Sequence, residues 1–239
     1  MTRLELLEIA KPILFNAEMV RAIQNGDKTV TRRKVKPQPN KGSCLWTDNL
    51  LPETVEADAG NVYAFSDGTV TTPPYKVGDI LYVRETWGIY EQNYMDANYI
   101  MYRADFPNGA KAFSADGVSC DLPTWRPSIH MPKEAARIFL RVTDVRVERL
   151  QDIITGDYRT PLNINKEGLI LSCCFCTHHN GDCKDFIAQH SHKTLTCKLL
   201  EDYILLWNST VKKSDLDKYG WDANPWVWVI EFERVEVTE

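Results

Sequence analysis

The amino-acid sequence predicts a mixed α/β protein that is mainly β, built as a small closed or strongly curved β-barrel with helices on its outside. Several short β-prone runs alternate with few helical segments, a pattern typical of small barrels. The segment 138–147 is a second indication. Its apolar alternation runs through Leu140 and Val142 and resumes in the opposite phase at Val145 and Val147. This phase change predicts a bulge or sharp bend, which strands of small barrels often need.

The other elements follow from caps, turn residues and apolar spacing. Asn16 is an N-cap residue and Gly26 a C-terminal stop, so a helix is expected over 17–25. Pro and Gly are frequent over 36–75, which predicts a loop-rich insertion with at most a hairpin. β-prone runs predict strands over 28–33, 80–87, 99–103 and 226–232, and an apolar stripe predicts a helix over 199–207.

Composition excludes several classes of protein. The chain has 239 residues, a net charge of −5 and 44% hydrophobic residues, which excludes a disordered or collagen-like chain. No apolar run approaches the ~18 residues of a membrane span. The segment MTRLELLEIAKP is a poor signal peptide, so we expect a cytoplasmic protein whose seven cysteines are reduced. The net acidity means that any nucleic-acid binding must use a local basic patch.

A series of short motifs resembles the ASCH domain, a member of the PUA-like superfamily. The string GDKTVTRR at 26–33, which we name the basic motif, resembles the family signature G-x-K-T-x-T-x-R. VGD at 77–79 and VIEF at 229–232 resemble its later strands. The longer strings VRETW at 83–87, WRPSIHMP at 125–132 and WDANPW at 221–226 resemble a phage and prophage branch, which implies a bacterial host cell. The resemblance implies one domain over 1–239, interrupted at 36–75 and at 170–197.

The resemblance implies that a cleft beside the basic motif binds RNA, a modified nucleobase or a nucleoside. One bacterial relative hydrolyses the amide of N4-acetylcytidine, through a Lys, a Thr three residues later and a downstream Glu. Lys28 and Thr31 match the first two, and Glu167 is the best match for the third. The alternatives are a non-catalytic nucleic-acid-binding or adaptor module of phage origin, and a ribonuclease.

The same residues carry suitable chemistry on their own. A buried Lys has a lowered pKa and works as a base, a Thr hydroxyl attacks or positions water, and a Glu moves the proton. In an ideal strand, residues three apart point to opposite faces, so Lys28 and Thr31 converge only if Lys28 lies in the turn after Gly26 or the strand is distorted. The alternative is a solvent-facing Lys28 after a helix C-cap.

Charged and aromatic residues supply candidate ligand contacts. Six basic and no acidic residues lie between 28 and 41, among them Arg32 and Arg33, and they suit phosphate binding. Trp87 and Trp125 are candidates for base stacking, although aromatic residues more often pack in a core. Glu85 lies in an apolar run and is expected to pair with a cation, Arg32 or Arg33 included, as a structural ion pair or a base-edge acceptor.

The insertion at 170–197 has metal-ligand composition. It holds five of the seven Cys and four of the five His. Tetrahedral zinc needs four such ligands. A loop with few apolar residues has little core of its own, so a bound metal would stabilise its fold. We expect a structural zinc held by Cys173, Cys176, Cys183 and Cys197, with His190 as the alternative to the last. A free-thiol loop or a redox disulfide is the other interpretation.

Overall fold

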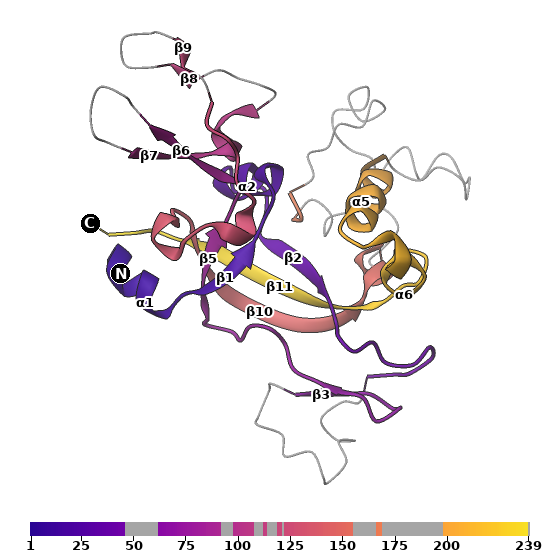
Figure 1. The fold of residues 1–239 in the computed structure, drawn as a ribbon. Coiled ribbons are helices and arrows are strands. Elements are labelled where there is room, and N and C mark those ends of the chain that lie inside the picture. Colours follow the sequence, from indigo (N-terminus) through magenta and orange to yellow (C-terminus); the bar gives the residue numbers. More distant parts are fainter. Residues whose placement is uncertain are drawn as a thin grey trace, which may run out of the picture. The chain divides into compact units, whose positions relative to one another are not determined.

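The computed structural model describes residues 1–45, 62–91, 98–107, 112–113, 119–120, 122–154, 166–168 and 198–238 (Figure 1). The chain forms two compact units. The first unit comprises Met1–Lys28, Gly78–Val142 and Phe232–Glu239, and the second comprises Thr29–Val77 and Thr143–Glu231.

The helices and strands are short, apart from two long strands that run through both units. The first unit contains α1 (Arg3–Ile9), β1 (Lys11–Leu14), α2 (Ala17–Gln24), β5 (Ile80–Arg84), β6 (Trp87–Glu91), β7 (Asn98–Tyr102), β8 (Ala112–Phe113) and β9 (Ser119–Cys120). The second contains β2 (Val30–Lys34), β3 (Tyr63–Ala64), β4 (Val70–Thr71), α5 (Lys198–Ser209) and α6 (Leu216–Tyr219). The two long strands are β10 (Phe139–Arg149) and β11 (Trp226–Val235).

A five-stranded mixed sheet has the order β1-β5-β10-β11-β2. β1 pairs with β5 in parallel, whereas β10 pairs with β5, and β11 with β2, in antiparallel fashion. The prediction of a mixed α/β protein made mainly of strands is therefore confirmed. The order is linear from β1 to β2, so the described part of the chain does not form the closed barrel that we expected.

The first unit shows where the predicted elements hold and where one of them breaks. Asn16 caps α2, because its Oδ1 accepts a hydrogen bond from the Met19 N–H at 2.8 Å. The strand predicted over 80–87 is instead two strands, since β5 ends at Arg84 and β6 begins at Trp87. The core of this unit contains Leu6, Tyr82, Met131 and Phe139.

The second unit is built around an aromatic core. Tyr203 and Trp207 of α5 pack with Trp221 and with Val229 of β11. The apolar stripe that predicted this helix is confirmed. β11 is buried continuously from Trp226 to Ile230, as its apolar sequence predicts.

Two irregular features also match their sequence patterns. β3 and β4 form a hairpin inside the 36–75 insertion, and Gly68 takes a positive φ of 84° in its turn. In β10, Leu140 and Val142 are buried and so is Val147, an odd number of residues later. The burial of Leu140, Val142 and Val147 therefore follows the phase of the sequence pattern, whereas β10 is one continuous strand and the predicted bulge or sharp bend stays a prediction. None of the helices in the described residues is long and apolar enough to cross a membrane.

Candidate functional site

Lys28 is a buried lysine at the end of the first unit. It follows the turn after α2, where its N–H donates to the Ala22 carbonyl at 3.1 Å and Gly26 takes a φ of 83°. Only 2% of Lys28 is exposed, and its Nζ lies 5.8 Å from the centroid of the Phe15 ring. The interpretation of Lys28 as a solvent-facing residue after a helix cap is therefore wrong.

The basic motif continues into β2 of the second unit, where successive side chains alternate between the two faces of the strand. Thr31 is 1% exposed, and its Oγ1 accepts a hydrogen bond from Arg33 Nη1 at 2.9 Å. Arg33 also donates to the Arg32 carbonyl at 3.2 Å. Burial lowers the pKa of Arg33, and the negative charge of Glu167 opposes that shift. Thr31 and Arg33 thus share one face, and Arg32 belongs to the other.

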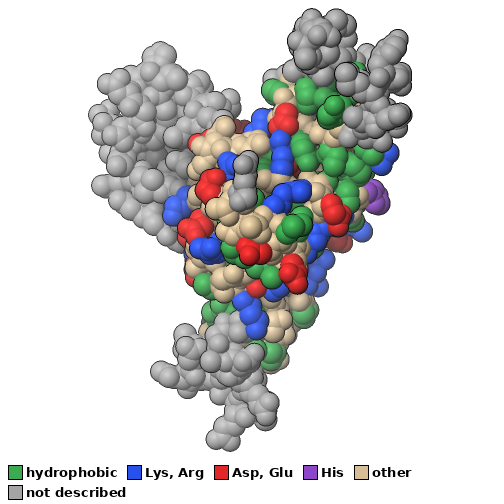
Figure 2. Space-filling view, turned by 90° about the vertical axis from the view of Figure 1, so that its left-hand side faces the viewer, with side chains coloured by type: hydrophobic (Ala, Val, Ile, Leu, Met, Phe, Trp, Pro, Cys, Tyr) green, Lys and Arg blue, Asp and Glu red, His purple; other side chains and the backbone are tan. Residues whose placement is uncertain are grey.

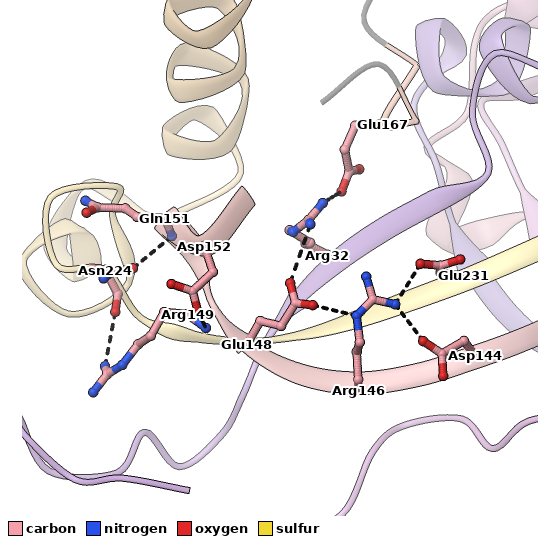
Figure 3. Close-up of polar contacts among 10 residues, drawn as sticks. All are labelled: Arg32, Asp144, Arg146, Glu148, Arg149, Gln151, Asp152, Glu167, Asn224 and Glu231. Carbon is pink, nitrogen blue, oxygen red and sulfur yellow. Dashed lines mark hydrogen bonds and ion pairs between the residues drawn. The ribbon is translucent and has the colours of Figure 1, made fainter. Parts of the chain in front are cut away.

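Arg32 joins two carboxylates on its own face of β2. Its Nη1 donates to Glu167 Oε1 at 2.7 Å, and its Nη2 lies 3.7 Å from Glu148 Oε2 (Figure 3). The side chains of Arg32 and Glu167 are only 2% and 6% exposed. A pair this short and buried is a strong charge-assisted contact, because little water competes for it.

The backbone beside Glu167 is also fixed to the basic motif. The Lys166 carbonyl accepts hydrogen bonds from the Thr29 and Val30 N–H groups, at 2.9 and 3.1 Å. Gly168 has a φ of 82°, a conformation that glycine adopts without a steric penalty. The structure therefore brings Glu167, predicted from a distant part of the sequence, against the Arg32 face of β2, which is opposite to the face that carries Thr31.

Tyr203 of α5 lies in the same environment, and we did not single it out from the sequence. Burial raises the pKa of its phenol, and the nearby Glu167 carboxylate raises it further, while Arg32 opposes both. No hydrogen bond of ordinary geometry joins its hydroxyl, or the Nε of Arg32, to any described residue. Tyr203 belongs to the apolar stripe that predicted α5, so its neighbours in the sequence did not indicate this polar environment.

A second arginine extends this chain of charges along β10. Arg146 Nε donates to Glu148 Oε1 at 2.5 Å. Arg146 Nη1 donates to Asp144 at 2.6 Å and to Glu231 at 2.7 Å (Figure 3). Glu148 therefore contacts both Arg32 and Arg146, which orients it beside the basic motif.

Glu85 has a different partner from the one we expected. Its two oxygens accept hydrogen bonds from Nε and Nη2 of Arg137, at 2.8 and 2.9 Å, within the first unit. The expected pairing with Arg32 or Arg33 is wrong, because Arg32 binds Glu167 and Arg33 binds Thr31. Burial raises the pKa of Glu85, and the hydrogen bonds from Arg137 oppose that shift. These contacts favour the structural ion pair over the base-edge acceptor.

The two tryptophans differ in exposure. Trp87 is buried in the core of the first unit, and the Arg126 guanidinium lies 5.1 Å from its ring centroid. Trp125 is half-buried, with Phe106 at 6.1 Å and the Arg103 guanidinium at 5.8 Å from its ring. Trp125 therefore suits stacking with a ligand better than Trp87 does.

Exposed basic residues follow β2 in the second unit. Lys36 and Lys41 are exposed, and Lys34 Nζ lies 4.9 Å from the centroid of the Tyr219 ring. On the face shown in Figure 2, Lys and Arg side chains alternate with Asp and Glu side chains. Among the basic residues over 28–41, Lys36 and Lys41 are exposed, whereas Lys28 and Arg32 are buried.

The predicted zinc ligands Cys173, Cys176, Cys183 and Cys197, together with His190, lie outside the described residues. Within the described ranges, no group of three or more His, Cys, Asp and Glu residues is placed to hold a metal ion. The zinc site stays a prediction from the spacing and composition of 170–197.

Comparison of the chain with protein families, with curated proteins and with solved structures found no match.

Proposed function

We propose that this chain has a PUA-like fold of the ASCH type, that it binds RNA or a modified nucleoside, and that it hydrolyses the amide of an N4-acylated cytidine. The observation that carries the proposal is the burial of the three residues that match the relative's Lys, Thr and Glu. Lys28, Thr31 and Glu167 are each no more than 6% exposed.

Lys28 is buried beside an aromatic ring, and removing an ammonium group from water is costly. Lysine is almost always exposed in folded proteins, and burial favours its neutral form. A neutral amine is a base, which an exposed lysine at neutral pH is not. The environment of Lys28 therefore supports a role in proton transfer.

The proposed reaction consumes one water and splits one C–N bond. Water, or the Thr31 hydroxyl followed by water, adds to the acetyl carbonyl, and Lys28 accepts the proton released from the attacking oxygen. Glu167 takes this proton from Lys28 and passes it to N4 as the C–N bond breaks, so both groups end the reaction in the protonation state in which they began it. The products are cytidine and acetate. Arg32 and Arg33, which contact Glu167 and Thr31, hold these two groups in place.

The test replaces Lys28 by methionine, which keeps an apolar stem of similar volume. We expect Lys28→Met to reduce kcat by about 100-fold or more, because loss of a proton-transfer group has that effect. Nucleoside binding, measured by calorimetry, should persist through stacking and backbone contacts. Unchanged kcat in a folded Lys28→Met protein would exclude Lys28 as the base.

A second candidate function is RNA binding without turnover, as a recognition or adaptor module. The exposed Lys36 and Lys41, with Lys34 beside Tyr219, favour it, because phosphate contacts need accessible cations. Binding of single-stranded RNA by a protein that releases no acetate would support this function over hydrolysis. Cleavage of the RNA itself would instead indicate a ribonuclease.

A further inference from the structure

The tripeptide Lys166–Gly168 contacts the basic motif through both its backbone and a side chain. Its Lys166 carbonyl accepts the Thr29 and Val30 N–H groups, and its Glu167 side chain binds Arg32. We propose that Arg32 is a positioning residue: it docks this tripeptide on β2 and fixes the orientation of the Glu167 carboxylate for the reaction. This inference rests on the proposed function for the catalytic part, and on geometry alone for the docking.

The contacts distinguish Arg32 from the other charged groups around it. Arg32 Nη1 is 2.7 Å from Glu167, whereas its separation from Glu148 is 3.7 Å. The guanidinium and the Glu167 carboxylate are both nearly excluded from water. Burying a charged group is costly unless a partner of opposite charge is hydrogen-bonded to it, so each of these two groups depends on the other for its position. Arginine stays charged at any accessible pH, so it suits this role better than lysine.

The charged and titratable groups that face Glu167 come from three elements. Arg32 and Arg33 belong to β2, and both interact electrostatically with Glu167. Tyr203 of α5 presents a neutral phenol to it. Glu148 of β10 is held on the far side of the guanidinium by Arg146 (Figure 3). The hydrogen bond from Arg32 ties the Glu167 carboxylate to β2, so removal of Arg32 should release this carboxylate from the strand.

Backbone docking gives a readout that does not depend on turnover. The Thr29 and Val30 amides are protected through the Lys166 carbonyl, so their hydrogen exchange reports whether the tripeptide stays on β2. We expect Arg32→Gln to speed exchange at these two amides by about tenfold or more, the value of a charge-assisted hydrogen bond. Buried β11 amides such as those of Val229 and Ile230 serve as the internal reference for global opening.

Two control variants, and one variant that keeps the charge of Arg32, separate positioning from general destabilisation. Glu148→Gln removes the weaker, 3.7 Å partner of Arg32 and should leave exchange at Thr29 and Val30 unchanged. Arg141→Gln breaks the exposed Arg141–Glu233 pair and should also leave it unchanged. Arg32→Lys keeps the charge but loses the planar fork, so it should restore protection in part.

Turnover gives the catalytic readout. Arg32→Gln should lower kcat on N4-acetylcytidine by about 10- to 100-fold with little change in KM, because misplacing a group by about 1 Å has that effect. Arg32→Lys should recover part of this loss, because it keeps the charge.

The outcomes keep the two proposals distinguishable. Absence of turnover by the wild-type protein defeats the proposed function and the catalytic part of the inference, while the exchange experiment still decides whether Arg32 docks the tripeptide. Unchanged exchange at Thr29 and Val30 in Arg32→Gln overturns the docking. Should Arg32→Gln fail to fold, Glu167→Gln tests the same contact from the other side and must speed exchange at the same amides. Normal kcat in a folded Arg32→Gln protein overturns the positioning role.

Discussion

Arg32 and Glu167 form a buried ion pair of 2.7 Å although they lie 135 positions apart in the sequence. The contact joins β2 to a short segment near the Cys/His-rich insertion, within the second unit. Without this contact, the basic motif would suggest a solvated strand. Glu167 instead supplies a buried carboxylate partner to the motif. The interior of this unit therefore contains a polar network beside its aromatic core.

The Glu85–Arg137 pair should stabilise the first unit. Arg137→Ala leaves the Glu85 carboxylate buried without its bidentate partner, and we expect a loss of about 2–4 kcal/mol in unfolding free energy. The partial exposure of Arg137 keeps the value below that of a fully buried pair. Denaturant titration measures the change. Arg141→Ala, which breaks an exposed pair, is the control and should cost less than about 1 kcal/mol.

The same carboxylate should make stability depend on pH. Burial raises the pKa of Glu85 above its ordinary value of 4.5, with Arg137 opposing. The folded protein then retains this proton to higher pH than the unfolded chain does, so its stabilising contribution is present below 4.5 and declines as pH rises through the raised value. Wild-type stability relative to Glu85→Gln should fall over that range. A constant difference across pH would contradict this linkage.

Leu150 should carry a large share of the second unit's packing energy. It is fully buried in the core with Trp207 and Val229, so Leu150→Ala should cost about 2–5 kcal/mol. Leu205, on the same helix as Trp207, is 68% exposed. Leu205→Ala makes the same chemical change and should alter the unfolding free energy by less than about 0.5 kcal/mol. Equal losses in both variants would show that this core is wrongly described.

The Cys/His-rich insertion should carry about one zinc per chain, because thiolate and imidazole ligands favour this ion. Elemental analysis of protein prepared without chelator measures the stoichiometry. Cys176→Ser should lower both the zinc content and the thermal stability while leaving ligand binding unchanged. Cys44→Ser, an exposed cysteine elsewhere, is the matched control and should keep the metal. Metal-free protein would support the free-thiol or disulfide interpretation.

RNA binding should depend on the exposed lysines that follow β2 and not on Arg32, which is occupied by Glu167. Reversing Lys36 and Lys41 to Glu should weaken binding of a single-stranded RNA and flatten its dependence on salt, because fewer phosphates are neutralised. Reversal of the exposed Arg141 and Arg234 makes the same change in net charge away from this surface. Equal weakening by both double variants would indicate a non-specific charge effect.

Local patterns in the sequence predicted most of the elements. Asn16 and Gly26 bound α2, and the Tyr203–Trp207 stripe marked α5. Each depends on neighbours within a few positions, so each is visible in a linear pattern. The break between β5 and β6 was missed. It lies at Glu85, whose contact with Arg137 cannot be read from the apolar run.

Long-range pairing could not be predicted in the same way. The partner of Glu85 was expected to be Arg32 or Arg33 and is Arg137, since charge complementarity alone does not select among many arginines. The role of Arg146 with its three carboxylates was missed for the same reason. Glu167 was proposed through a family pattern, and no spacing rule connects it to β2. Such contacts depend on how distant strands pair, which residue order does not show.

The most direct measurement is product analysis after incubating the wild-type protein with N4-acetylcytidine. We expect cytidine and acetate in equal amounts, increasing with time and protein concentration, and nearly abolished by Lys28→Met. Binding of the nucleoside without release of either product, at a protein concentration that saturates it, would contradict hydrolysis and leave recognition of RNA or a nucleoside as the function.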